Sequence, residues 1–309
     1  MGLQPNKIIK QAWIFTKQKK FLWGFGLFLI WINLGAYLLL GSLLESAAGE
    51  ATAMPAEVPN ATLQVVGFGV IALAGFAFFA YFRSRAGIIL AVRELTERKP
   101  ASFVRSFGEA GNYTPHLLRL WISLLSVLIL VSYILSWPVN HLYASHLTQR
   151  ADILAAFAGI VLACVLYVVL MFNAFAARFI VLLKMTVPDA MRTTHDIVSS
   201  YWWPLFWFSM RMVIVTLAAC FAAMAAQSLI MAPFVISSGL SYDMGANLLN
   251  SPAILTGLAL SCVSFVWIFS VAAAFQQICW TLVFKELVNA KRSEELVPVE
   301  EEAVSEEVI

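Results

Sequence analysis

The chain has 309 residues, of which 61% are hydrophobic and 12% are charged, and its formal net charge is +2. A soluble domain has about 25% charged residues, so this composition excludes an ordinary soluble protein. Several apolar runs are long enough to cross about 30 Å of hydrocarbon as a helix, which takes roughly 20 residues. The composition therefore predicts a polytopic membrane protein.

In chain order, the sequence predicts six membrane-spanning helices. They lie at about 21–44, 63–82, 117–136, 153–183, 205–231 and 254–284. The predicted fold is an all-α membrane bundle that forms a single domain over residues 1–292. The remaining residues, 293–309, contain seven Glu and no Lys or Arg. We expect this segment to be a disordered acidic tail.

Basic residues fall almost entirely on one side of this six-span arrangement. Nineteen of the 20 Lys and Arg residues lie on the side that holds both termini, and Arg150 alone lies on the other. Because loops rich in Lys and Arg remain in the cytoplasm, the sequence predicts that both termini are cytoplasmic.

Three segments with helical spacing of apolar residues precede outgoing spans. They are PNKIIKQAWIFTKQKKFLWGF from Pro5, PASFVRSFGEAGNYTPHLLRLW from Pro100 and PDAMRTTHDIVSSYWWPLFWF from Pro188. Proline suits the first turn of a helix, and Lys10, Arg105 and Arg192 occupy comparable places. The pattern predicts three cytoplasmic interfacial amphipathic helices.

The same pattern predicts a threefold internal pseudo-repeat, with units at about 5–90, 100–184 and 188–287. Each unit would contain one amphipathic helix, one span leading out and one span leading back. Two interpretations of the helices remain open. They are either anchors that fix the topology, or a cytoplasmic collar that binds anionic lipid or a protein partner.

Arginines near the cytoplasmic ends of the helices are candidates for binding lipid headgroups. They are Arg83, Arg85, Arg105, Arg119, Arg178, Arg192 and Arg211. Side chains at this depth can extend along the helix to reach water. Alternatively they face inward, where guanidinium groups suit bidentate capture of phosphate.

Polar amides within the predicted spans form a second candidate set. They are Asn33, Asn173, Gln227, Gln276 and Gln277. These amides either form hydrogen bonds between helices or contact a transported solute. No Asp or Glu lies in the middle of a span, which disfavours a proton-coupled transporter or an ion pump.

The sequence contains no Walker loop, no GxSxG elbow, no HExxH and no CxxC pair. His141 and His146 lie near Asp152, but their spacing of five residues suits a polar loop better than a metal site. We therefore expect no catalytic residue, no metal, no cofactor and no nucleic-acid partner.

Four segments together resemble a known group of proteins. They are QAWIFTKQKKFLWGFGLFL, ERKPASFVRSFGEAGNY, VPDAMRTTHDIVSSYWWPLFWF and ICWTLVFKEL. They are similar to bacterial six-span proteins related to the membrane domain attached to some glycerophosphoryl diester phosphodiesterases. The resemblance covers nearly the whole chain and rests on composition.

This resemblance implies an inner-membrane location, with the pairs Pro100/Pro188 and Arg105/Arg192 as shared structural positions. In the fused enzymes the chemistry belongs to a separate soluble domain, which this sequence does not contain. No catalytic residue follows from the resemblance.

The leading functional hypothesis is a non-enzymatic integral membrane protein that binds lipid or a protein partner at its cytoplasmic face. The alternative is a small-solute permease or a substrate-binding transport subunit. An intramembrane enzyme is a third hypothesis, which the lack of a nucleophile–base pair or metal cluster disfavours.

Overall fold

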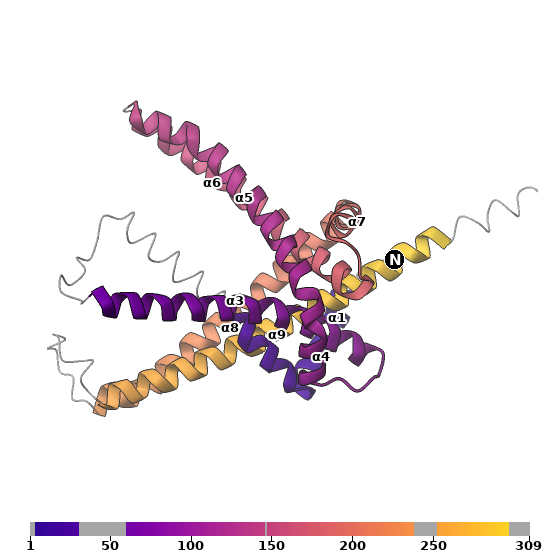
Figure 1. Cartoon of the computed structure of the whole chain (residues 1–309), viewed down its shortest axis with the longest axis horizontal. Helices are drawn as coiled ribbons and strands as arrows, with labels where there is room; N and C mark the ends of the chain where they lie inside the picture. Colours follow the sequence, from indigo (N-terminus) through magenta and orange to yellow (C-terminus); the bar gives the residue numbers. More distant parts are fainter. Residues whose placement is uncertain (1–3, 31–59, 146, 238–251, 297–309) are drawn as a thin grey trace, which may run out of the picture. The chain divides into compact units, whose positions relative to one another are not determined.

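The structure is a computed structural model that describes residues 4–30, 60–145, 147–237 and 252–296. All regular secondary structure in these ranges is helical. The helices are shown in Figure 1, and their bounds are α1 Pro5–Gln18, α3 Asn60–Thr96, α4 Phe103–Ala110, the 3₁₀ helix η1 Gly111–Tyr113, α5 Thr114–Ala144, α6 Thr148–Leu183, α7 Val187–Ser200, α8 Trp202–Ser237 and α9 Pro252–Leu296. A further apolar helix covers Phe21–Ile30.

Five helical segments in the described residues are long and apolar enough to cross a membrane. They are Gly75–Thr96, Phe103–Ala144, Thr148–Leu183, Trp202–Phe234 and Ile254–Lys291. The all-helical fold is thereby confirmed, and five such segments fit a multi-pass membrane protein. The first expected span is described only over Phe21–Ile30, and its remainder, including Asn33, lies outside the described residues.

Four long helices, α3, α5, α8 and α9, continue beyond the predicted ends of their spans, and α3 and α9 do so furthest. Helix α3 ends at Thr96, whereas the expected span ended at residue 82. The extension contains Arg83, Arg85 and Arg93 and has no proline before Pro100. Arginine is a good helix former, so polarity marks the end of the apolar stretch and not the end of the helix. Helix α9 likewise ends at Leu296, four residues into the expected tail.

The chain divides into two compact units, which are described separately below. Unit 1 comprises Met1–Leu3, Gly111–Phe206 and Trp280–Ile309, and unit 2 comprises Gln4–Ala110 and Trp207–Cys279. Helices α8 and α9 therefore contribute residues to both units. The prediction of a single membrane domain made of three sequence units remains a prediction.

Unit 1 is built on the pair α5 and α6, which pack against each other after a three-residue connection, and α7 packs on α6. Its core includes an aromatic cluster. The ring centroid of Phe284 lies 4.8 Å from that of Phe179 and 6.3 Å from that of Phe175. Trp280 also meets Phe175 edge to face at 5.9 Å. These contacts fasten the end of α9 to α6, since aromatic pairs stabilise by about 0.5–1.5 kcal/mol beyond their buried area.

Unit 2 depends on close approach between helices at glycine. A Cβ atom at Gly26 would lie 1.9 Å from the carbonyl oxygen of Ser270 on α9. A Cβ atom at Gly87 on α3 would lie 2.5 Å from the Phe25 ring. Phe25 in turn packs on Phe103 of α4, with ring centroids 4.6 Å apart. Absence of a side chain at the two glycines is thus what allows this packing.

Candidate functional site

Helix α1 presents basic residues to the outside of unit 2. Ile8, Ala12 and Thr16 are buried along one face of this helix. Three exposed lysines, Lys7, Lys10 and Lys17, lie on the opposite face. Trp13 is 55% exposed beside them, although its ring also contacts Phe275 at a centroid distance of 6.1 Å.

Helix α7 has the same division of faces in unit 1. Its buried positions are Ala190, Thr194, Ile197 and Val198. Arg192 is exposed, and so are the acids Asp189 and Asp196. Helix α7 is therefore less positively charged on its exposed side than α1, which has no acid.

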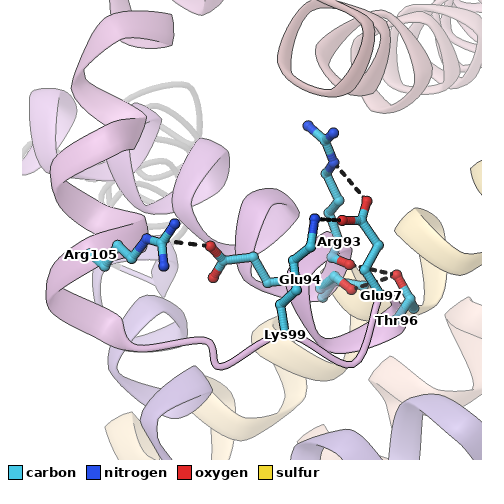
Figure 2. Close-up of polar contacts among 7 residues, drawn as sticks. Arg93, Glu94, Thr96, Glu97, Lys99 and Arg105 are labelled. Carbon is cyan, nitrogen blue, oxygen red and sulfur yellow. Dashed lines mark hydrogen bonds and ion pairs between the residues drawn. The ribbon is translucent and has the colours of Figure 1, made fainter.

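Helix α4 is shorter than expected, because it ends at Ala110 and is followed by η1 and then by α5. Its Arg105 is exposed, and its Nε atom lies 3.6 Å from a carboxylate oxygen of Glu94 on α3 (Figure 2). The predicted headgroup ligand Arg105 is thus already paired with an acid in unit 2.

The end of α3 contains two further ion pairs, which Figure 2 also shows. Glu97 accepts a hydrogen bond from Lys99 Nζ at 2.7 Å and another from Arg93 Nε at 2.9 Å. The hydrogen bond from Lys99, followed by that from Arg93, lowers the pKa of Glu97 from 4.5 to about 2. The acids Glu94 and Glu97 are therefore paired with three of the four bases at this junction.

The side chains of Arg83 and Arg85 are packed against other residues of unit 2. Arg83 Nε donates to the carbonyl oxygen of Phe107 at 2.7 Å, and its guanidinium carbon lies 4.6 Å from the centre of the Phe107 ring. These two contacts tie α3 to α4. Arg85 is only 4% exposed. Neither side chain extends freely to solvent.

Arg178 is the largest of the fully buried side chains and is 1% exposed. Its Nε donates to Thr281 Oγ1 of α9 at 3.2 Å, and its Nη1 donates to the carbonyl oxygen of Ala174. Both partners belong to unit 1. Arg178 therefore joins α6 to α9 inside the protein.

The remaining predicted arginines are exposed. Arg211 Nη1 donates to the side-chain oxygen of Asn6 at 3.2 Å, which links α8 to α1 within unit 2. Arg119 on α5 and Arg192 on α7 are exposed in unit 1. The seven arginines are thus divided between structural contacts and open surface, and four of them belong to unit 2 and three to unit 1.

Among the predicted amides, Gln276 forms the expected hydrogen bond between helices. Its Nε2 donates to Thr216 Oγ1 of α8 at 2.5 Å. Asn173, Gln227 and Gln277 are half-buried. No group of three or more metal-ligating side chains lies close enough to hold a metal ion in the part of the chain that the structure describes.

Unit 1 also contains a cavity that the sequence did not indicate. Its volume is about 260 Å³, and it is lined by Asn112, Tyr113, His116, Ile180, Lys184 and Met185. Lys184 entered the sequence analysis only as one of many basic residues. Its proximity to His116 depends on the pairing of α5 with α6, and no spacing in the sequence reveals it.

The chain was compared with protein-family models, with curated proteins and with solved structures, and none of them matches it.

Proposed function

We propose that this chain is a non-enzymatic integral protein of a bacterial inner membrane that binds anionic lipid at its cytoplasmic face. The proposal includes six spans with both termini cytoplasmic, and three repeated units similar to the membrane domain of some glycerophosphoryl diester phosphodiesterases. The alternative that the experiments below test is that the same face binds a protein partner in place of the lipid.

The exposed surface of α1 is the observation that supports the proposal most directly. Lys7, Lys10 and Lys17 are exposed while the opposite face of the helix is buried. Each basic residue near an anionic membrane surface contributes about 1 kcal/mol of attraction. The exposed Trp13 suits the level of the headgroups, because its ring is amphipathic.

The backbone supports the repeat. Arg98 and Lys184 are the non-glycine residues with positive φ in the described ranges, at 57° and 55°. Each follows the end of a long helix, α3 or α6, and each precedes a short helix, α4 or α7. A base with positive φ thus recurs after α3, between the first and second sequence units, and after α6, at the end of the second unit.

The proposed topology is tested with reporter fusions. Fusions after Glu57, His146 and Asp243, all of which lie outside the described residues, should report the non-cytoplasmic side. Fusions after Lys99 and Lys291 should report the cytoplasm. A single reversed loop would contradict the six-span arrangement.

Lipid binding is tested by native mass spectrometry of the full-length protein, purified in mild detergent from membranes that contain phosphatidylglycerol. We expect the Lys7→Gln, Lys10→Gln, Lys17→Gln variant to retain several-fold less phosphatidylglycerol than the native protein. Single variants Lys10→Glu and Arg150→Glu provide a matched pair, because both change one exposed base by the same charge on opposite proposed sides.

Only Lys10→Glu should lower retention. Equal retention in all variants would refute lipid binding through α1. A copurifying polypeptide in place of lipid, lost in the triple variant, would assign this surface to a protein partner.

A further inference from the structure

The cavity of unit 1 lies where the beginning of α5 meets the end of α6. Asn112 and Tyr113 belong to η1, His116 lies in the first turn of α5, and Lys184 follows the last residue of α6. Ile180 and Met185 complete the lining with apolar surface. At about 260 Å³, the cavity is smaller than the roughly 300–1,000 Å³ typical of sites for drug-sized ligands. It suits a compact chemical group.

The polar lining consists of groups that can donate hydrogen bonds. The Lys184 ammonium has three N–H donors, the Asn112 amide has two, and the Tyr113 hydroxyl and the His116 ring can each donate as well. No Asp or Glu is part of the lining. This set of groups favours an anionic ligand, because an ammonium with several neutral donors supplies charge-assisted hydrogen bonds to an anion.

These donors have no protein acceptor in the described residues. Side chains of Asn112, Tyr113, His116 and Lys184 form neither hydrogen bonds nor ion pairs with any part of the chain that the structure describes. By contrast, three of the four bases at the α3–α4 junction, Arg93, Lys99 and Arg105, have an acid within 4 Å. The charge of Lys184 is thus available to a ligand.

The backbone of Lys184 gives an independent indication. Its φ of 55° and ψ of 32° place it in the left-handed region at the end of α6. Glycine is the usual occupant of such a position, since a side chain there costs about 1–2 kcal/mol. Residues held in this conformation cluster at functional sites. At Lys184 this conformation places a base in the cavity lining, whereas Arg98, the other non-glycine residue with positive φ in the described ranges, does not line the cavity.

We propose that this cavity binds a phosphate group, with Lys184 as its cationic ligand and with Asn112, Tyr113 and His116 as hydrogen-bond donors. A phospholipid headgroup and a soluble phosphate present the same chemistry to these side chains. Where the phosphate belongs to a lipid, the inference rests on the proposed function and assigns one headgroup to the cavity of unit 1, a site made of other residues than the α1 surface.

The matched control for Lys184 is Arg98. Both residues are basic, both are exposed and both have a positive φ after a long helix. Substitution by glycine removes one positive charge and relieves the same backbone conformation at either position. Arg98 does not line the cavity. The two variants Lys184→Gly and Arg98→Gly therefore make the same change in net charge and in backbone conformation, but only Lys184→Gly removes a side chain from the cavity lining.

Full-length protein in an uncharged, phosphate-free detergent is titrated with inorganic phosphate and, separately, with dioctanoyl phosphatidic acid, and binding is followed by ³¹P NMR. Dioctanoyl phosphatidylcholine is the lipid control without a phosphate monoester. We expect Lys184→Gly to weaken binding roughly tenfold or more, as loss of a hydrogen bond from a charged group predicts. Arg98→Gly should bind as the native protein does. His116→Ala, which keeps Lys184 in place, should weaken binding by a smaller factor.

Binding of inorganic phosphate that depends on Lys184 would identify a soluble anion as a sufficient ligand. Binding of phosphatidic acid alone, with the same dependence, would identify a headgroup. The proposal is overturned if neither probe binds, if both Lys184→Gly and His116→Ala bind as the native protein does, or if Arg98→Gly loses as much affinity as Lys184→Gly.

These outcomes are separate from those for α1. Lipid retention that depends on the α1 lysines but not on Lys184 would leave the proposed function standing and refute the cavity. Phosphate binding that depends on Lys184, with no lipid retained through α1, would do the reverse.

Discussion

The α3–α4 junction of unit 2 and the α6–α7 junction of unit 1 use the same local device with different electrostatics. In both, a long helix ends, a base adopts positive φ, and a short helix follows. At the first junction, Glu94 and Glu97 form ion pairs with Arg93, Lys99 and Arg105. At the second, Lys184 lines a cavity that contains no acid.

One part of this difference lies four residues before the base with positive φ. Glu94 lies four residues before Arg98, and Ile180 lies four residues before Lys184. Glu94 pairs with Arg105, whereas Ile180 is buried and forms an apolar part of the cavity lining. The acid at the first junction is therefore paired with Arg105, whereas the corresponding position at the second junction is part of a cavity available to an anion.

The largest expected effect concerns Arg178, which holds α6 to α9 within unit 1. Arg178→Ala removes the contact with Thr281 and leaves a void, so we expect a loss of about 2–5 kcal/mol in the free energy of unfolding. Thermal unfolding in detergent, followed by near-ultraviolet circular dichroism, measures this loss. Arg192→Ala on the exposed side of α7 is the control, expected within about 0.5 kcal/mol of the native protein. Equal stability of the two variants would contradict a structural role for Arg178.

A smaller effect is expected at the packed junction of unit 2. In Gly87→Ala, the new Cβ meets the Phe25 ring at 2.5 Å and presses it toward Phe103, so we expect a loss of about 1–3 kcal/mol. The control is Gly108→Ala in α4, where a Cβ meets nothing within 4 Å. That change should stabilise by about 0.5–1 kcal/mol, because alanine is the better helix former.

The unfolding midpoints of both variants are measured by heating the protein with a maleimide dye, which reacts with the buried Cys279 thiol once the protein unfolds. The other three cysteines are replaced by alanine so that only Cys279 can react. Unfolding midpoints that shift in the same direction for Gly87→Ala and Gly108→Ala would refute the close packing of Phe25 on α3.

Removal of the Glu94 carboxylate should make the α3–α4 junction more similar in charge to the α6–α7 junction. Glu94→Gln releases Arg105 from its ion pair and should change the free energy of unfolding by less than about 1 kcal/mol. Retention of phosphatidylglycerol, measured by native mass spectrometry, should rise. Glu109→Gln on α4 removes the same charge from a residue with no ion pair in the described ranges, and should raise retention less. A larger rise in the control would show that net charge alone decides retention.

The smallest expected effect is the pH dependence contributed by Glu97. Its pKa is lowered from 4.5 to about 2 in the folded protein. The stabilisation is therefore complete above pH 4.5 and is lost as the pH falls toward 2. Since Glu97 lies at the surface, the contribution should be well under about 1 kcal/mol. The difference in unfolding midpoint between the native protein and Glu97→Gln should shrink between pH 6 and pH 3, and a constant difference would contradict the lowered pKa.

Sequence reasoning predicted the helical fold because apolar runs and proline positions are local signals. The extension of α3 to Thr96 was missed, since hydropathy reports the membrane and says little about where a helix ends. Of the polar residues, Gln276 has the hydrogen bond between helices that was expected. The partners of Arg83, Arg105 and Arg178 were not predictable, because they lie 24, 11 and 103 positions away along the chain.

The sequence by itself determined that this is an all-helical protein with segments able to cross a membrane, because composition and periodicity follow from the solvent that each residue faces. It also predicted three short amphipathic helices, and the structure has the helices α1, α4 and α7 in these places. Only the tertiary structure decided which bases are compensated by acids and which remain available. That decision depends on distances across helix pairs, such as the pairing that brings Lys184 and His116 into one cavity with no carboxylate in its lining. Periodicity along one helix cannot encode such a distance, because it is set by how two helices pack.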